Sequence, residues 1–238
     1  MVDFEKEFSN PGFNVAVDER TAVASVFKSV YGWMCAGLAI SGGIAWYTFT
    51  SGLWQRIFEG GIFMGLLIAE LVLVMVLSAA IRKISAGVAL LMFLAYAALN
   101  GLTLSVVFIA YKLALVQRVF FITAAMFGGL AVWGSVTRSD LSSVGSVCGM
   151  ALWGLIVASI ANLFFGGSRL DWICSFAGIL IFSGLTMYDA QKIRALAASG
   201  RALDEKEMRK IAIIGSLELY LDFINLFLHI LRFFGRRR

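Results

Sequence analysis

The sequence predicts an all-α, polytopic membrane protein in which seven helices form a transmembrane bundle. Hydrophobic residues make up 60% of the 238 residues and charged residues only 15%, whereas a soluble domain has about 45–50% apolar and about 25% charged residues. The apolar residues also occur in long blocks, and a helix that crosses a bilayer needs roughly 20 of them. Seven blocks joined mostly by short connections therefore predict seven crossings, over residues 30–49, 62–81, 86–111, 119–136, 144–165, 170–188 and 211–234.

Little chain remains outside these blocks for a soluble domain. We expect residues 1–29 to form a cytoplasmic N-terminal segment, residues 30–234 the transmembrane domain and residues 235–238 a basic C-terminal tail. The first 29 residues lack a basic start followed by a short apolar core, so we expect no cleavable signal and a first span that stays in the protein. Cys35, Cys148 and Cys174 lie far apart in apolar surroundings, which indicates packed thiols rather than a disulfide or metal framework.

The distribution of Lys and Arg predicts the orientation, because cytoplasmic loops carry an excess of both. With seven crossings, the side that holds the N-terminus collects twelve of these residues and the other side eight, so we expect a cytoplasmic N-terminus. A re-entrant last helix would make the count sixteen against four. The block at 211–234 is long enough to span, which favours seven crossings and leaves the side of the arginine tail open. The net charge of +5 reflects these flanks, so no nucleic-acid partner is expected.

Glycines inside the blocks predict close helix packing, since small residues let membrane helices approach each other. No internal duplication is clear enough to predict an inverted-repeat transporter. The glycines concerned are Gly32, Gly37, Gly42, Gly43, Gly128, Gly129, Gly178 and Gly184.

The last block carries a polar stripe. Glu218, Asp222, Asn225 and His229 are spaced four, three and four residues apart, which places them on one helix face. A charged side chain near the middle of a bilayer costs about 2.5–3.5 kcal/mol on insertion scales. We therefore expect this face to point into the bundle, toward water or other polar groups.

Other blocks supply polar groups that are candidates for the same core. Glu70 lies in the middle of the second block, and Arg82 follows at its end, either as a flanking anchor or as a latch. Asp189 closes the sixth block, where it is either functional or simply interfacial. For Asp222 and Glu70 the alternative is structural pairing between helices, and for His229 an interfacial position. The uncharged candidates are Asn100, Thr103, Asn162, Ser183 and Thr186.

A core rich in oxygen-bearing side chains suits a hard cation, and Ca²⁺ in particular accepts mixed carboxylate, carbonyl and water ligands. Two carboxyl groups held close together cannot both ionise freely. Such a pair is neutral and hydrogen-bonded at low pH, and repelling or cation-binding at high pH. In outline this is a proton-sensitive gate.

Three stretches resemble a known family. LNGLTLS at residues 99–105, GLTMYDAQKI at 184–193 and LELYLDFINLFL at 217–228 are similar to bacterial members of the Bax inhibitor-1 family, also called the transmembrane Bax inhibitor motif family. The resemblance covers nearly the whole chain in the number and order of spans. It implies a seven-helix bundle with the last helix at its centre, in a bacterial inner membrane.

The resemblance also implies a pH-sensitive calcium leak governed by two aspartates, which match Asp189 and Asp222. By position, Glu70 and Arg82 match an acidic and a basic residue of the family's second helix, the basic one a latch toward the last helix. The family often reads Tyr-Asp-Thr-Gln after the sixth span, whereas this chain has Ala190 in place of the threonine. The missing hydroxyl removes one hydrogen bond near the aspartate.

The leading hypothesis is therefore a pH-sensitive cation leak channel with calcium at Asp189 and Asp222, and no tightly bound cofactor. Its expected partners are membrane lipid, calcium and protons. The alternative is a regulator without transport that binds another membrane protein, such as a protease or a translocation component; a proton-coupled solute transporter is a weaker third. No nucleotide loop, HExxH pair or GxSxG motif occurs in the sequence, so we expect no enzyme.

Overall fold

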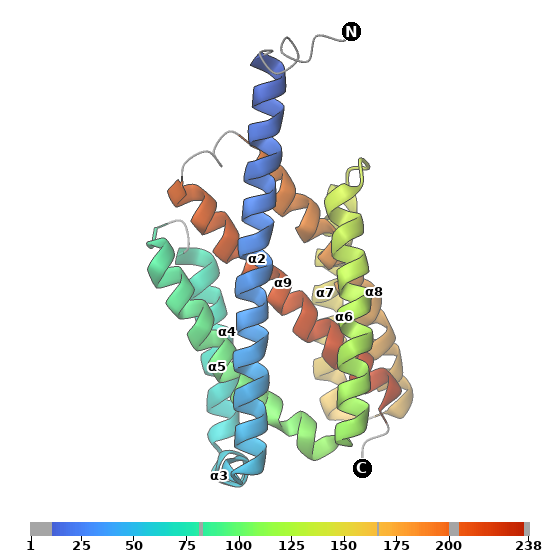
Figure 1. Ribbon diagram of the computed structural model, residues 1–238. Coiled ribbons are helices and arrows are strands. Elements are labelled where there is room, and N and C mark those ends of the chain that lie inside the picture. The colour runs from blue at the N-terminus through green and yellow to red at the C-terminus, as the bar shows by residue number, and fades with distance from the viewer. Residues whose placement is uncertain (1–10, 81–82, 166, 200–204, 236–238) are drawn as a thin grey trace.

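The computed structural model describes residues 11–80, 83–165, 167–199 and 205–235. Within these ranges every regular element is a helix, so the all-α expectation is confirmed. Six of the helices are long and apolar enough to cross a membrane. Figure 1 shows them side by side in one bundle. The elements are α2 (Pro11–Thr50), α3 (Leu53–Glu59), α4 (Ile62–Ala80), α5 (Ala86–Ala110), α6 (Leu113–Val136), α7 (Ser142–Phe165), α8 (Ser168–Ala198) and α9 (Glu205–Phe234).

The number of membrane crossings depends on how the second predicted crossing is defined. The short helix α3 meets α4 at an angle of 89°, and the pair makes a seventh span only if it is taken as one broken crossing. Gly52 and Gly61 flank α3 with φ of 75° and 70°, a left-handed conformation that glycine adopts without steric cost. The two glycines thus allow the chain to turn sharply into and out of α3.

Helices extend beyond the apolar blocks, mostly at one end. α2 begins at Pro11 rather than at residue 30, so the expected boundary between residues 29 and 30 falls inside a continuous helix. α8 continues ten residues past Tyr188, and α9 begins at Glu205. The extensions of α8 and α9 are rich in Ala, Lys, Arg and Glu, which are strong helix formers. An apolar block therefore marks the hydrocarbon layer, while the helix itself runs on into the polar surroundings.

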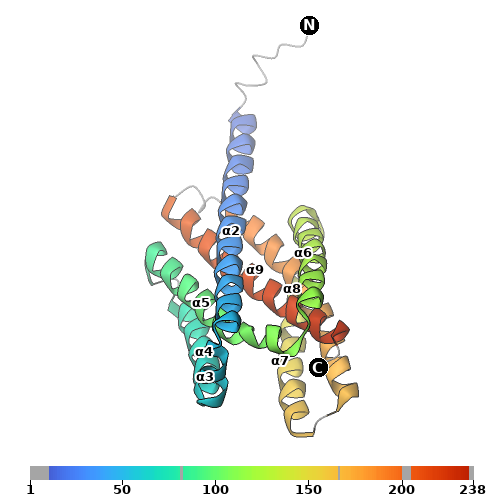
Figure 2. The same ribbon diagram turned by 60° about the horizontal axis from the view of Figure 1, so that its bottom comes forward.

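α9 is the most deeply buried of the candidate spans. In its most apolar stretch 72% of the residues are buried, against 11% in α7. It packs against α8, α2, α6 and α5, and it crosses the bundle obliquely in both views (Figures 1 and 2). α7, by contrast, presents large apolar side chains outward, including Trp153 and Phe164. A polar group on α9 is therefore shielded from lipid, and one on the outer face of α7 is not.

Close approach of α6 and α7 to α8 fixes the segment that carries Asp189. At Gly134 of α6 an added Cβ would collide with the backbone of Met187. At Gly145 of α7 it would lie 2.6 Å from the ring of Tyr188. Side chains larger than hydrogen at these two positions would push the helices apart. The residues just before Asp189 are thus held tightly on two sides.

Candidate functional site: a carboxyl pair on α8 and α9

Asp189 of α8 and Asp222 of α9 face each other across the interface of these two helices. Their carboxyl groups lie within hydrogen-bonding reach of one another, and Asp222 is only 4% exposed. The Oδ2 atom of Asp222 receives no hydrogen bond from any N–H or O–H group in the described residues. An ionised carboxylate can only accept hydrogen bonds. The pair is therefore satisfied only when a proton or a cation lies between the two groups.

A charged pair one helical turn away completes the cluster. Lys192 of α8 donates to Glu218 of α9, with 2.5 Å between Nζ and Oε1. Residues three or four apart on a helix are neighbours on one face, so Lys192 lies beside Asp189 and Glu218 beside Asp222. We call these four residues the aspartate cluster. It holds three carboxyl groups and a single ammonium group.

The rest of the polar stripe on α9 points the same way, as its spacing predicts. The ring of His229 stacks on Phe182 of α8 at 5.6 Å between centroids and lies against Gly178 of the same helix. The Nδ1 atom of His229 is buried and has no partner among the described residues. Asn225 donates to the carbonyl of Leu221 in its own helix, at 2.8 Å.

Beyond the aspartate cluster, the stripe borders a cavity of about 740 Å³ between α7, α8 and α9. This cavity lies toward the end of the bundle at which α9 ends. Several polar side chains line it, and Asp171 and Arg232 give it one charge of each sign. The polar lining residues are Ser159, Asn162, Asp171, Asn225, His229 and Arg232.

Glu70 belongs to a second polar cluster on another face of α9. Its two carboxylate oxygens accept hydrogen bonds from Thr103 Oγ1 at 2.7 Å and from Asn100 Nδ2 at 3.3 Å, both on α5. Tyr220 of α9 donates its hydroxyl to Asn100 Oδ1 at 3.0 Å and shares a 2.6 Å hydrogen bond with Ser41 of α2. We call these five residues the Glu70 network. They join α2, α4, α5 and α9.

The expected single polar core is therefore divided into two. Tyr220 and Asp222 are two residues apart, which turns their side chains about 200° from one another around α9. Ser183 and Thr186 join neither cluster, since each donates to a carbonyl of its own helix. Asn162 accepts from the backbone of Gly167. Arg82, the candidate latch residue, lies outside the residues that the structure describes.

Three residues of these clusters were not among the candidates from sequence. Tyr220 and Ser41 sit in apolar runs, where a single hydroxyl carries no spacing signal. Lys192 was counted as a marker of orientation and as a basic neighbour of Asp189 at the membrane interface. A usable signal existed for Lys192, because it follows Asp189 by three residues and so shares its helix face.

The aspartate cluster supplies few ligands for a metal ion. Among the described residues, no group of three or more His, Cys, Asp and Glu side chains is arranged to hold a metal ion. Asp189 and Asp222 supply two carboxyl groups, while Ca²⁺ takes six to eight oxygen ligands. Water would have to complete the coordination.

Comparison with known proteins places the chain in a family. A family model described as inhibitor of apoptosis-promoting Bax1 matches residues 23–238. The inner membrane protein YbhL of Escherichia coli K12 is 43% identical over 230 residues, 96% of this chain and 98% of the relative. An uncharacterized protein of Borreliella burgdorferi is 42% identical over 88% of this chain and 90% of its own length. Another, of Rickettsia prowazekii, is 33% identical over the full length of both chains.

Proposed function

Because this chain belongs to the Bax inhibitor-1 family and is an integral protein of the bacterial inner membrane, we propose that it is a pH-sensitive leak for calcium or a similar cation, gated by Asp189 and Asp222. In this proposal the broken pair α3–α4 makes a seventh crossing and α9 is the central helix of the bundle. The N-terminus lies in the cytoplasm.

A single observation carries the proposal: a carboxyl group that is 4% exposed, with an oxygen that receives no hydrogen bond from the part of the chain that the structure describes, faces a second carboxyl group on the neighbouring helix. Intramembrane ionisable residues are expensive and usually functional. A purely structural carboxyl group would be expected to find donors, because buried polar groups are normally hydrogen-bonded. Here the missing partner is supplied by the other carboxyl group together with a proton or a cation.

The gate works by competition between protons and cations. With one shared proton, the two carboxyl groups form a hydrogen bond that holds α8 and α9 together. Without it, two negative charges share a buried site and repel each other, and a cation that enters restores neutrality. Cation binding therefore releases protons and weakens as the medium becomes more acidic.

The route beyond the gate follows the stripe on α9. From Asp222 it passes Asn225 and reaches His229 at the cavity of about 740 Å³. On the other side of the gate, the pair Lys192 and Glu218 is partly exposed, with 37% and 26% of the side-chain surface accessible. Water-accessible polar groups thus flank the buried carboxyl pair on both sides, as a gated path requires.

A second candidate function is a regulator that carries no ions and binds another membrane protein, such as a protease or a translocation component. The observation that favours it is the N-terminal part of α2, which projects well beyond the other helices (Figure 1). A projecting helix offers a surface for a partner. Recovery of one stoichiometric membrane partner, together with no flux, would favour this candidate.

Calcium entry into liposomes tests the proposal. Purified protein is reconstituted with a calcium dye inside, and flux is followed from acidic to mildly alkaline pH. We expect pH-dependent flux in the native chain, and loss of that dependence in Asp222→Asn and Asp189→Asn. Asp140→Asn is the matched control for Asp189→Asn, because it makes the same change at an exposed aspartate outside both the aspartate cluster and the cavity. No flux above empty vesicles from folded protein would overturn the proposal.

A further inference from the structure

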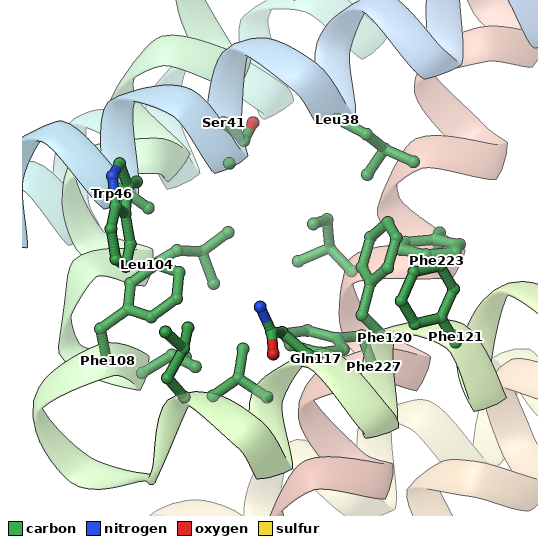
Figure 3. Close-up of a pocket in the computed structure, with 16 residues that line it drawn as sticks. Leu38, Ser41, Trp46, Leu104, Phe108, Gln117, Phe120, Phe121, Phe223 and Phe227 are labelled. Carbon is green, nitrogen blue, oxygen red and sulfur yellow. The ribbon is translucent and has the colours of Figure 1, made fainter.

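A large apolar cavity lies on the side of α9 away from the aspartate cluster. Its volume is about 460 Å³, within the range of ligand-binding pockets. α2 packs along α5 and α9, while α6 packs along α8 and α9. The cavity is the space left between α2, α5, α6 and α9, and Figure 3 shows it in close-up.

Aromatic and aliphatic side chains form nearly all of its wall. The polar side chains among its lining residues, apart from the indole of Trp46, are Ser41 and Gln117. Ser41 is already bonded to the carbonyl of Ala97 and to Tyr220. The amide of Gln117 points into the cavity (Figure 3). The aromatic residues of the wall are Trp46, Phe108, Phe120, Phe121, Phe223 and Phe227.

The cavity is continuous with the lipid-facing surface of the bundle. Three of its lining residues are themselves exposed on membrane-spanning helices: Phe121 by 71%, Trp46 by 45% and Phe120 by 41%. In a bilayer the molecules next to such an opening are lipid tails rather than water. An acyl chain entering here would gain van der Waals contacts along the aromatic wall, which is the interaction that drives association inside a membrane.

Polar and basic groups stand at the end of the cavity where α2 and α5 end and α6 begins. Lys112 immediately precedes the lining residue Leu113, and Arg118 follows Gln117. Both basic side chains are exposed. Basic groups beside a cleft between transmembrane helices suit the phosphate of a lipid headgroup, and the Gln117 amide suits an ester carbonyl. An apolar cleft, one amide and flanking cations together match a phospholipid.

We propose that this cavity binds one acyl chain of a phospholipid from the leaflet at which α2 and α5 end. The lipid lies between α2 and α6 and contacts Phe223, Ile224 and Phe227 of α9. Ile224 is two residues from Asp222 and points about 200° away from it around α9, so the bound chain supports α9 on the side away from the carboxyl pair. The site requires no ion flux and stands independently of the leak proposal.

Two neighbouring glycines provide a matched pair of variants. Gly42 lines the cavity, and an added Cβ there meets no atom within 4 Å. Gly42→Phe therefore fills the cavity without a clash at the backbone. Gly43 also has open space around it but is not a lining residue. Gly43→Phe makes the same change in the same helix and leaves the cavity empty.

The experiment uses Trp46 as a reporter, with the other five tryptophans changed to Phe. A phospholipid brominated on its acyl chains, which quenches tryptophan fluorescence, is titrated into the protein in detergent. We expect saturable quenching at about one lipid per protein in the parent and in Gly43→Phe, and its loss in Gly42→Phe. Circular dichroism checks that all three are folded.

Two outcomes would overturn the proposal. One is quenching that rises with lipid without saturating and is the same in both glycine variants, which indicates bulk lipid only. The other is a dimer in the parent and in Gly43→Phe that becomes a monomer in Gly42→Phe without saturable quenching. In that case the cavity accepts a second copy of this chain rather than a lipid.

Discussion

The two polar clusters at α9 each bury a carboxyl group to a similar degree. They differ in the hydrogen bonds that this carboxyl group accepts. Glu70 is 8% exposed and Asp222 is 4% exposed. Both oxygens of Glu70 accept hydrogen bonds, from Thr103 and Asn100, whereas Oδ2 of Asp222 accepts none from the described residues. A fully satisfied buried network rigidifies a fold, and an unsatisfied one is costly. The Glu70 network is thus suited to fixing the helices, and the aspartate cluster to exchanging a ligand.

The largest effect on stability is expected at Glu70. Glu70→Ala leaves the amide of Asn100 without its acceptor in a buried site, so we expect the free energy of unfolding to fall by about 1–3 kcal/mol. Asp222→Asn should not cause a loss of that size, because no donor among the described residues depends on the Oδ2 atom. Unfolding of the purified proteins in detergent measures both. A larger loss in Asp222→Asn than in Glu70→Ala would reverse the assigned roles.

A smaller loss is expected at Tyr220. Tyr220→Phe keeps the ring, which packs against Phe93 and Tyr96, and removes only the hydroxyl that joins Ser41 to Asn100. One such hydrogen bond contributes about 0.5–1.5 kcal/mol. The same unfolding measurement tests this, and the pH dependence of flux should remain native. A variant with flattened pH dependence would show that the two clusters act together.

Lys192 tests the charge balance of the aspartate cluster. Lys192→Met removes its one ammonium group at similar side-chain length, so we expect calcium to bind several-fold more tightly. Lys192→Arg keeps the positive charge and is the matched control. Because the ion pair with Glu218 is partly exposed, stability should change by less than about 1 kcal/mol. Equal calcium affinity in the Met and Arg variants would show that the charge of Lys192 does not influence the cation site.

The smallest effect is expected at an exposed carboxylate outside both clusters. Asp140 accepts a 2.9 Å hydrogen bond from the backbone of Ser142 at the start of α7, and its hydrogen bonds with Ser142 lower the pKa of Asp140. A lowered pKa in the folded state adds stability above the ordinary pKa, and that stability is lost as pH falls through the lowered value. Asp140→Asn should reduce the melting temperature slightly at neutral pH and not in strong acid. A reduction of equal size at both pH values would contradict this origin.

The sequence correctly predicts features that depend on a single helix. Block ends such as residues 49, 136 and 234 fall within one residue of the helix ends, because the apolar run itself stops there. The stripe on α9 likewise follows from the period of the helix. Both predictions need no knowledge of the neighbouring helices.

Sequence reasoning fails where two helices must meet. Periodicity predicts on which face of its helix Glu70 lies, but not which helix packs against that face. The sequence therefore predicts one polar core where the structure has two clusters. The glycines show the same limit. Gly37, Gly178 and Gly184 contact neighbouring helices closely, whereas Gly32, Gly42, Gly43, Gly128 and Gly129 have open space around them. Composition is the same in both groups, and only packing separates them.

Infrared spectroscopy of the carboxyl groups tests most directly whether Asp189 and Asp222 exchange a proton for a cation. A protonated carboxyl group has a stretching band separate from that of a carboxylate, and Asp222→Asn with Glu70→Gln as control assigns it. We expect a protonated band that weakens on adding calcium, disappears in Asp222→Asn and persists in Glu70→Gln. A spectrum in which calcium changes no carboxyl band, or changes the same band in Asp222→Asn, would contradict the gate.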